Sequence, residues 1–149
     1  MNFKRYDLAQ TYLDNAYSFF EDGNDNNPFQ VDTQQANLYL LMIKNNVDCN
    51  VEDIFKKAHG LLMRPRTSRK DNPIKSLLLF QFYTQNEFIN RIKSSSLDDL
   101  YYDFCRDAYN KLEDYLKYTS IDIENNRKIK NISKKLFHIT CKKTSEGGI

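Results

Sequence analysis

The sequence predicts an all-α protein in which six helices form three antiparallel hairpins, arranged as a short solenoid or a compact bundle. Apolar residues recur at three- and four-residue steps along most of the chain, which is the period of a helix with one buried face. Glycine and proline are scarce, at 4 and 3 of 149 residues, and this composition disfavours a turn-rich all-β fold. Hydrophobic residues make up 40% of the chain, which is sufficient for a folded core in a domain of this size.

The first two helices are expected on either side of a polar loop. The first covers about residues 6–20 and ends in residues 21–28, a run of acidic, Asn, Gly and Pro residues that is typical of a loop. The second begins near Asp32, which could cap the helix while Gln35 reaches back to it, as in a capping box. The apolar residues that follow, up to Ile43, lie on nearly all sides of the helix. We therefore expect the second helix to be the most buried.

The third and fourth helices have recognisable starts. The third follows Asn50 and reaches about Leu62, with an acidic first turn. The fourth is expected as one continuous helix to about Ile92, capped by Asn72. Pro73 then occupies the first helical position, where the missing N–H costs nothing.

The last two helices are also delimited by short polar residues. Ser96 and Asp99 indicate the start of the fifth helix, which extends to about Tyr118. The sixth begins near Asp122. The core residues that these helices predict are Leu13, Phe20, Leu40, Leu41, Ile54, Leu62, Leu78, Phe104 and Leu112.

Three of the expected helices share a small residue four positions before a large one, which suggests a helical repeat. A neighbouring helix can approach closely at the small residue and pack against the large one. The pairs are Ala16–Phe20, Ala58–Leu62 and Ala108–Leu112.

Several segments carry a resemblance to known helical modules. The strings NAYSFFED (residues 15–22) and DIFKKAHGLL (residues 53–62) resemble helices of tetratricopeptide-type repeats. The string VDTQQANLYLL (residues 31–41) is similar to a segment in helical modules of bacterial defence proteins, where such modules follow sirtuin-like or STAND-type NTPase domains; residues 64–83 add to this likeness. The resemblance covers residues 8–92 and implies a short TPR-like solenoid that acts as a sensor or scaffold, with no catalytic residues.

Charge alternates along the chain in blocks that the net charge of +2 conceals. Residues 1–63 carry 5 basic and 9 acidic side chains, and residues 64–96 carry 7 and 2. Residues 97–124 carry 3 and 8, and residues 125–149 carry 7 and 1. Two acidic segments therefore alternate with two basic ones, which could pair within the fold or face a charged partner.

The basic segments supply the first set of candidate partner-binding residues. Arginine presents a planar fork of donors that suits phosphate or carboxylate groups. Either a solvated face that pairs with the acidic blocks or a phosphate-binding surface fits this pattern. The candidates are Arg64, Arg66, Arg69 and Lys70 in a basic loop over residues 64–70, and Arg127, Lys130 and Lys134 on the last helix.

An acidic stripe on the fifth helix supplies the second set. Like charges at helical spacing repel by a few tenths of a kcal/mol per pair, so such a stripe favours a positive neighbour, a metal or a partner protein. Its members are Asp99, Asp103, Asp107 and Asp114.

Residue patterns typical of catalysis are weak, so we expect no enzyme activity, no cofactor and no metal site. His138 and Cys141 lie one turn apart, but a zinc site needs about four ligands and no second pair accompanies them. The acidic residues near Cys105 would raise its thiol pKa and disfavour a nucleophile. The four glycines match no phosphate-binding loop.

These patterns predict a non-catalytic protein–protein interaction module, an adaptor or regulatory chain in a prokaryotic or phage-related defence setting. The alternative is a small nucleic-acid-binding regulator that uses the basic loop and the basic last helix. We expect a single helical domain over residues 1–141, a flexible tail over residues 142–149, and a protein partner, with a homo-oligomer left open. An odd number of cysteines and the absence of a long apolar run predict a cytoplasmic protein without a membrane partner.

Overall fold

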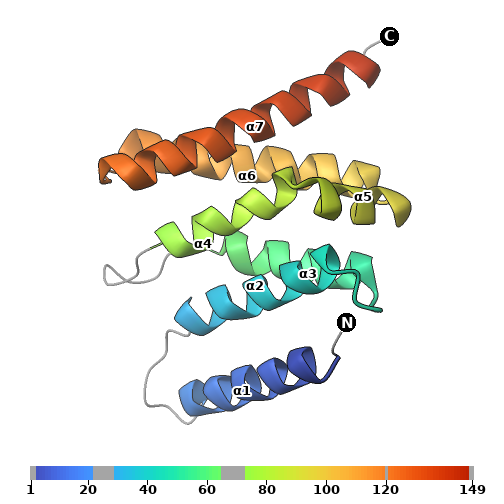
Figure 1. Ribbon diagram of the computed structural model, residues 1–149. Helices are drawn as coiled ribbons and strands as arrows, with labels where there is room; N and C mark the ends of the chain where they lie inside the picture. The colour runs from blue at the N-terminus through green and yellow to red at the C-terminus, as the bar shows by residue number, and fades with distance from the viewer. Residues whose placement is uncertain (1–2, 22–28, 65–72, 120, 148–149) are drawn as a thin grey trace. The chain divides into compact units, whose positions relative to one another are not determined.

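The computed structural model describes residues 3–21, 29–64, 73–119 and 121–147, and the elements in these ranges are helices without any strand (Figure 1). The all-α prediction is therefore confirmed for this part of the chain. Chain contacts divide the protein into two compact units, Met1–Pro73 and Ile74–Ile149. The single domain over residues 1–141 stays a prediction. Among the described helices, none has the length and hydropathy that crossing a membrane requires.

Unit 1 contains three helices, α1 (Phe3–Glu21), α2 (Phe29–Lys44) and α3 (Val51–Met63). Helix α2 packs against both α1 and α3. Helices α1 and α2 are antiparallel, because the Tyr6 hydroxyl accepts a hydrogen bond from Asn45 at the end of α2, whereas Tyr17 donates to Asp32 near its beginning.

Burial is greatest in α2 among the described α-helices, as its apolar pattern predicts. On the α1 side, Val31 and Leu38 form a small apolar cluster with Leu13. The buried residues of α2 are Val31, Asp32, Gln35, Ala36, Leu38, Leu40 and Ile43.

The connection from α2 to α3 is short and held by local hydrogen bonds. Asn46 has a φ of 61°, and the Val47 N–H donates to the Met42 carbonyl at 3.0 Å, which is the hydrogen bond of a Schellman motif. Asn50 then caps α3 by accepting from the Asp53 N–H at 3.0 Å. The predicted start of the third helix is confirmed.

Unit 2 contains α4 (Ile74–Leu78), the 3₁₀ helix η1 (Leu79–Thr84), α5 (Asn86–Ser94), α6 (Asp98–Tyr118) and α7 (Ile123–Gly147). Helix α7 continues past residue 141, where the sequence placed the start of a tail. It packs along α6 and also contacts α4 and η1.

Helices α6 and α7 form an antiparallel pair. The Ser133 hydroxyl donates to a carboxylate oxygen of Glu113 at 2.6 Å. One turn earlier on α6 and one turn later on α7, the Tyr109 and Phe137 rings lie 5.4 Å apart, as two antiparallel helices require. Asp122 accepts from the Asn125 N–H at 3.1 Å and so confirms the predicted start of this helix.

The prediction of one continuous helix up to Ile92 is wrong. The chain forms α4, continues as η1, and becomes extended at Gln85, with φ −92° and ψ 136°, before α5 begins. An aromatic cluster accounts for the break: Tyr83 stacks on Phe88 at 5.7 Å and meets Phe80 edge-on at 5.4 Å. In a 3₁₀ helix, residues three apart share a side, which lets both Phe80 and Tyr83 turn inward.

Ser96 does not cap α6, so that detail of the sequence analysis is also wrong. Ser96 has a φ of 59°, and the Leu97 N–H donates to the Ile92 carbonyl at 3.2 Å. This is again a Schellman hydrogen bond, so Ser96 ends α5 rather than starting α6.

The predicted core is confirmed in part. Leu13, Leu40, Leu62 and Leu112 are buried, whereas Leu41, Ile54, Leu78 and Phe104 are half-buried. The side chain of Phe20 lies outside the described residues. The half-buried residues lie at the edge of the buried faces, where the period of the helix alone does not separate core from rim.

Replacing Tyr101 by Phe tests the contact that fixes η1. The buried Tyr101 hydroxyl donates to the Tyr83 carbonyl at 2.6 Å, and burial raises the pKa of both phenols, so Tyr101 stays a donor. The variant removes this buried hydrogen bond, and we expect a loss of about 1–3 kcal/mol in the free energy of unfolding, measured by urea denaturation. Tyr118→Phe, at an exposed position, is the control, and equal effects of the two substitutions would contradict this reading of η1.

Candidate functional site

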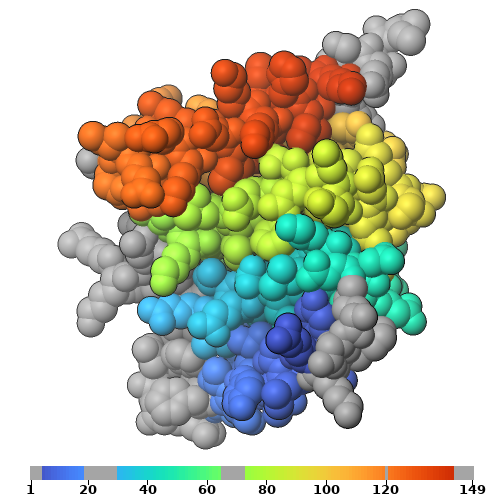
Figure 2. All heavy atoms as spheres, in the orientation of Figure 1, coloured from blue at the N-terminus to red at the C-terminus, as the bar shows by residue number. Residues whose placement is uncertain are grey.

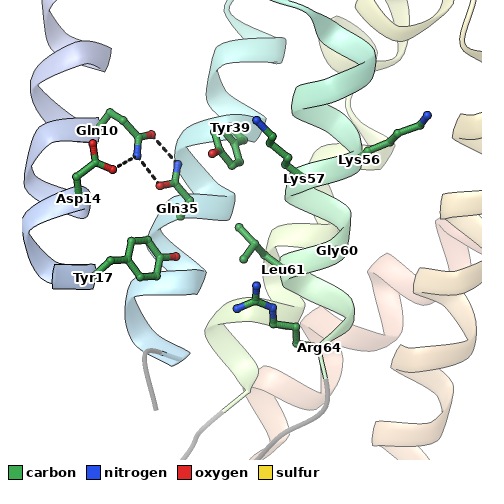
Figure 3. A pocket seen from close by; sticks show the side chains of 10 residues that line it. All are labelled: Gln10, Asp14, Tyr17, Gln35, Tyr39, Lys56, Lys57, Gly60, Leu61 and Arg64. Atoms are coloured by element: carbon green, nitrogen blue, oxygen red, sulfur yellow. Dashed lines mark hydrogen bonds between the residues drawn. The ribbon is translucent and has the colours of Figure 1, made fainter. Parts of the chain in front are cut away.

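A groove of about 550 Å³ runs over α2, with α1 on one side and α3 on the other (Figure 3). We call it the α2 groove. Its lining residues are Gln10, Asp14 and Tyr17 from α1, Gln35 and Tyr39 from α2, and Lys56, Lys57, Gly60, Leu61 and Arg64 from α3 and the residue that follows it.

The strip of α2 that faces this groove is polar. Asp32, Gln35 and Tyr39 lie three and four residues apart and therefore share one face of the helix. This strip lies between the side that packs on α1 and the side that packs on α3. Its polar groups are thus close to the core, and each needs a partner.

Gln10 and Gln35 bond to each other across the α1–α2 contact. Each amide donates to the carbonyl oxygen of the other, at 2.7 and 2.8 Å, and Gln10 also donates to Asp14 at 2.9 Å (Figure 3). The reciprocal pair fixes both side chains, so one wall and the floor of the groove are held in a single arrangement.

Asp32 is the buried charge beneath the groove. One carboxylate oxygen accepts from the Tyr17 hydroxyl at 2.6 Å and the other from the Arg64 guanidinium at 2.7 Å. Burial, together with the bond to Asp32, raises the pKa of the Tyr17 phenol above its ordinary value, so Tyr17 remains a donor. The predicted capping box at Asp32 and Gln35 is wrong, because α2 begins at Phe29 and both side chains bond to other helices instead.

The α3 side of the groove combines a cation with open space. Lys57 extends toward Tyr39, while the ammonium end of Lys56 points away from Tyr39 (Figure 3). Lys57 bonds to Asp53 at 3.0 Å, and this contact raises the pKa of its ammonium group. A Cβ added at Gly60 would meet nothing within 4 Å, so this position leaves room for a bound group.

Of the predicted basic loop over residues 64–70, the structure describes Arg64. Arg64 is tied to Asp32 by an ion pair of 2.7 Å and lines the α2 groove. Arg66, Arg69 and Lys70 lie outside the described residues.

The basic residues of α7 lie on its exposed face. Arg127, Lys130 and Lys134 are exposed, and the apolar residues Ile129, Ile132 and Leu136 are buried, as the helical spacing predicts. In Figure 2 the orange and red surface of α7 lies directly against the green surface of α4 and η1. Binding of a partner by these cations stays a prediction.

A second groove, of about 630 Å³, lies in unit 2 beside this basic face. We call it the α7 groove. Of the predicted basic residues on α7, Lys134 contributes to it. Its lining residues are Thr84 of η1, Ile89 of α5, and Asn131, Lys134, Lys135, His138, Ile139 and Lys142 of α7.

The acidic stripe lies on the exposed side of α6. Asp99, Asp103, Asp107 and Asp114 are all exposed, and the buried side of the helix carries Tyr101, Cys105, Ala108 and Leu112. Asp103 pairs with Arg106 at 3.7 Å within the same helix. Part of the expected repulsion is therefore relieved locally.

Apart from Arg64, sequence reasoning missed the residues that build the α2 groove. Gln10 and Tyr17 lie 15 to 25 residues from their partners Gln35 and Asp32, so local patterns do not pair them. A usable signal was present, because Asp32 and Gln35 are polar residues inside an otherwise apolar helix, and such residues need partners from another element.

Cys105 is a buried thiol. Burial raises the pKa of Cys105 to about 12. The environment therefore favours the neutral thiol, which is the direction that the sequence predicts, although desolvation and not the acidic neighbours is the cause. Among the described residues no three His, Cys, Asp or Glu side chains are grouped so as to hold a metal ion.

Comparisons with protein-family models, curated proteins and solved structures give no match to this chain. The resemblance to tetratricopeptide-type repeats and to modules of bacterial defence proteins therefore stays a prediction.

Replacing Arg64 by Ala tests the charge network under the α2 groove. The substitution leaves the buried Asp32 carboxylate with Tyr17 as its donor. Since Arg64 is itself half exposed, we expect a moderate loss of about 1–2 kcal/mol in the free energy of unfolding. Lys56→Ala is the control, because it removes an exposed ion pair of 3.2 Å and should leave the urea midpoint close to that of the wild type. An unchanged midpoint for Arg64→Ala would show that the charge network does not stabilise unit 1.

Thiol labelling tests the burial of Cys105. Cys105 is buried and its raised pKa keeps the thiol protonated at pH 8, whereas Cys141 is exposed. Mass spectrometry after iodoacetamide treatment should find Cys141 modified in the native protein and Cys105 modified only after unfolding. Labelling of both at similar native rates would contradict the burial of this side of α6.

Proposed function

We propose that the protein is a non-catalytic interaction module, and that its α2 groove binds a segment of another protein. The observation that carries this proposal is a groove with contributions from three helices whose polar floor is already held by side-chain hydrogen bonds. Groups that are fixed before binding lose less entropy when a partner arrives, so such a surface suits recognition.

The chemistry of the α2 groove supports a polypeptide ligand. Gln10 and Gln35 offer amide groups that can bond to a peptide backbone, and Tyr39 adds an aromatic face with a hydroxyl group. Lys57 and Arg64 supply positive charge on the α3 side, so an acidic side chain of the partner fits there. Tyrosine and arginine are also the residue types that most often dominate interface energetics.

The wider setting of the proposal rests on the sequence. The successive packing of α1, α2 and α3 supports a short TPR-like helical repeat built of hairpins, since the middle helix contacts both neighbours. The resemblance of residues 8–92 supports an adaptor or regulatory chain of a prokaryotic or phage-related defence system. Free thiols at Cys49, Cys105 and Cys141 support a cytoplasmic location, and self-association remains compatible with the proposal.

A nucleic-acid-binding regulator is the second candidate. The exposed positions of Arg127, Lys130 and Lys134 on one face of α7 favour it. A phosphate-binding surface of this kind would lose affinity steeply as salt rises.

A bulky residue at Gly60 tests the proposal directly. Because a Cβ added at this exposed position meets nothing within 4 Å, a side chain can leave the helix there, and Gly60→Trp should fold normally and fill the α2 groove. Affinity purification from cells that express the protein natively, followed by mass spectrometry, should recover a specific protein with the wild type and lose at least about nine-tenths of it, equivalent to 1.4 kcal/mol, with the variant.

Asn15→Trp is the matched control, since Asn15 is exposed on α1 and lies outside the groove lining. Equal recovery with wild type, Gly60→Trp and Asn15→Trp, or no specific protein with any of them, would contradict binding through the α2 groove.

A further inference from the structure

The α7 groove in unit 2 combines an apolar floor with a cationic rim. Ile89 of α5 and Ile139 of α7 are half-buried and supply apolar surface. Lys134, Lys135 and Lys142 are exposed on α7 and supply the charge. This groove belongs to the other unit and is distinct from the α2 groove.

The cations are spaced along the groove rather than gathered at one point. Lys134 and Lys142 are eight residues apart on α7, which corresponds to about 12 Å at the helical rise of 1.5 Å per residue. Two turns of a docked helix or about four residues of an extended strand cover the same length. The ligand that matches this row is therefore a polymer segment with several negative charges.

We propose that the α7 groove is a docking site for an acidic segment of a partner protein. This segment carries carboxylate side chains next to apolar side chains on the same face. The apolar side chains of the segment would cover Ile89 and Ile139, and its carboxylates would face the lysines. Burial of apolar surface provides affinity, and the charge complementarity provides orientation and a fast approach.

The composition of the groove favours a polypeptide over a nucleic acid. Proteins that hold single strands stack successive bases on aromatic rings, and the described lining of the groove offers no Phe, Tyr or Trp and a single imidazole, that of His138. Arginine, the residue that binds phosphate through a planar fork, lies outside the lining at Arg127, and the groove itself uses lysines.

A second copy of the chain matches the rim but not the floor. The exposed face of α6 offers carboxylates at Asp99, Asp103 and Asp107, while Leu112 is buried in its own unit and Leu100 and Phe104 are half-buried. A docked copy of α6 would therefore bring little apolar surface to Ile89 and Ile139.

The test measures binding of a fluorescent peptide, about 16 residues long, made of Glu, Leu and Ala, with the leucines on one helical face and glutamates beside them. A second peptide replaces each Leu by Ser, and a single-stranded DNA of similar charge is the nucleic-acid probe. Fluorescence anisotropy with the full chain at low salt should show that the Leu peptide binds at least about tenfold more tightly than the Ser peptide.

Two double variants with the same charge change locate the site. Lys134→Glu with Lys135→Glu alters the rim of the groove, and Arg127→Glu with Lys130→Glu alters exposed cations of the same helix outside it. The first should weaken binding of the Leu peptide by about tenfold or more, and the second by less than about threefold, because close charge pairs couple more strongly than distant ones. Circular dichroism verifies that both variants are folded.

Several results would overturn the proposal. Equal losses in the two double variants would indicate general attraction to a basic helix. Equal binding of the Leu and Ser peptides to the wild-type chain would show that the apolar floor does not contribute to binding; this comparison needs no variant. Tighter binding of the DNA probe than of the Leu peptide would indicate a nucleic-acid site. Self-association of the chain in sedimentation that the Leu peptide reverses would indicate that a second copy occupies the groove. No binding of the Leu peptide up to millimolar concentration would exclude a docking site for such a segment.

Discussion

Helix α2 contacts α1 on one side and α3 on another, and the α2 groove depends on this constraint. Val31 and Leu38 pack toward α1, and α3 covers another side of the same helix. The strip between these sides carries Asp32 and Gln35, whose polar groups cannot be buried without partners. The two flanking helices supply those partners, so the arrangement that stabilises unit 1 also arranges the side chains of the groove.

Asp32 shows how stability and site geometry are linked. A buried carboxylate is costly, and the bonds from Tyr17 and Arg64 offset this cost only when α1 and the end of α3 lie correctly on either side of α2. The same bonds hold Tyr17 and Arg64 in fixed positions at the groove. A partner that docks there meets side chains already ordered, and the entropy lost on binding is correspondingly smaller.

Much of the fold could be predicted from the sequence because helix period and capping are local properties. Asn50 and Asp122 mark the starts of α3 and α7, and the basic face of α7 follows from spacing alone. The break after Leu78 could not be predicted in this way, since it depends on the packing of Tyr83 against Phe80 and Phe88, and the Tyr101 hydroxyl that bonds to η1 comes from another helix, α6. The candidate site could be predicted only at Arg64, whose bond to Asp32 joins residues 32 positions apart that no local pattern pairs.

The account of unit 1 depends most on the reciprocal amide pair between Gln10 and Gln35, which joins the wall of the groove to its floor. A nuclear Overhauser spectrum of the ¹⁵N-labelled protein measures this contact directly, because the side-chain amide protons of the two residues are resolved from the backbone. The account predicts cross-peaks between the Gln10 and Gln35 amide groups and slow exchange of these protons with water. Absence of the cross-peaks, with amide protons that exchange as quickly as those of the exposed Gln34, would contradict it.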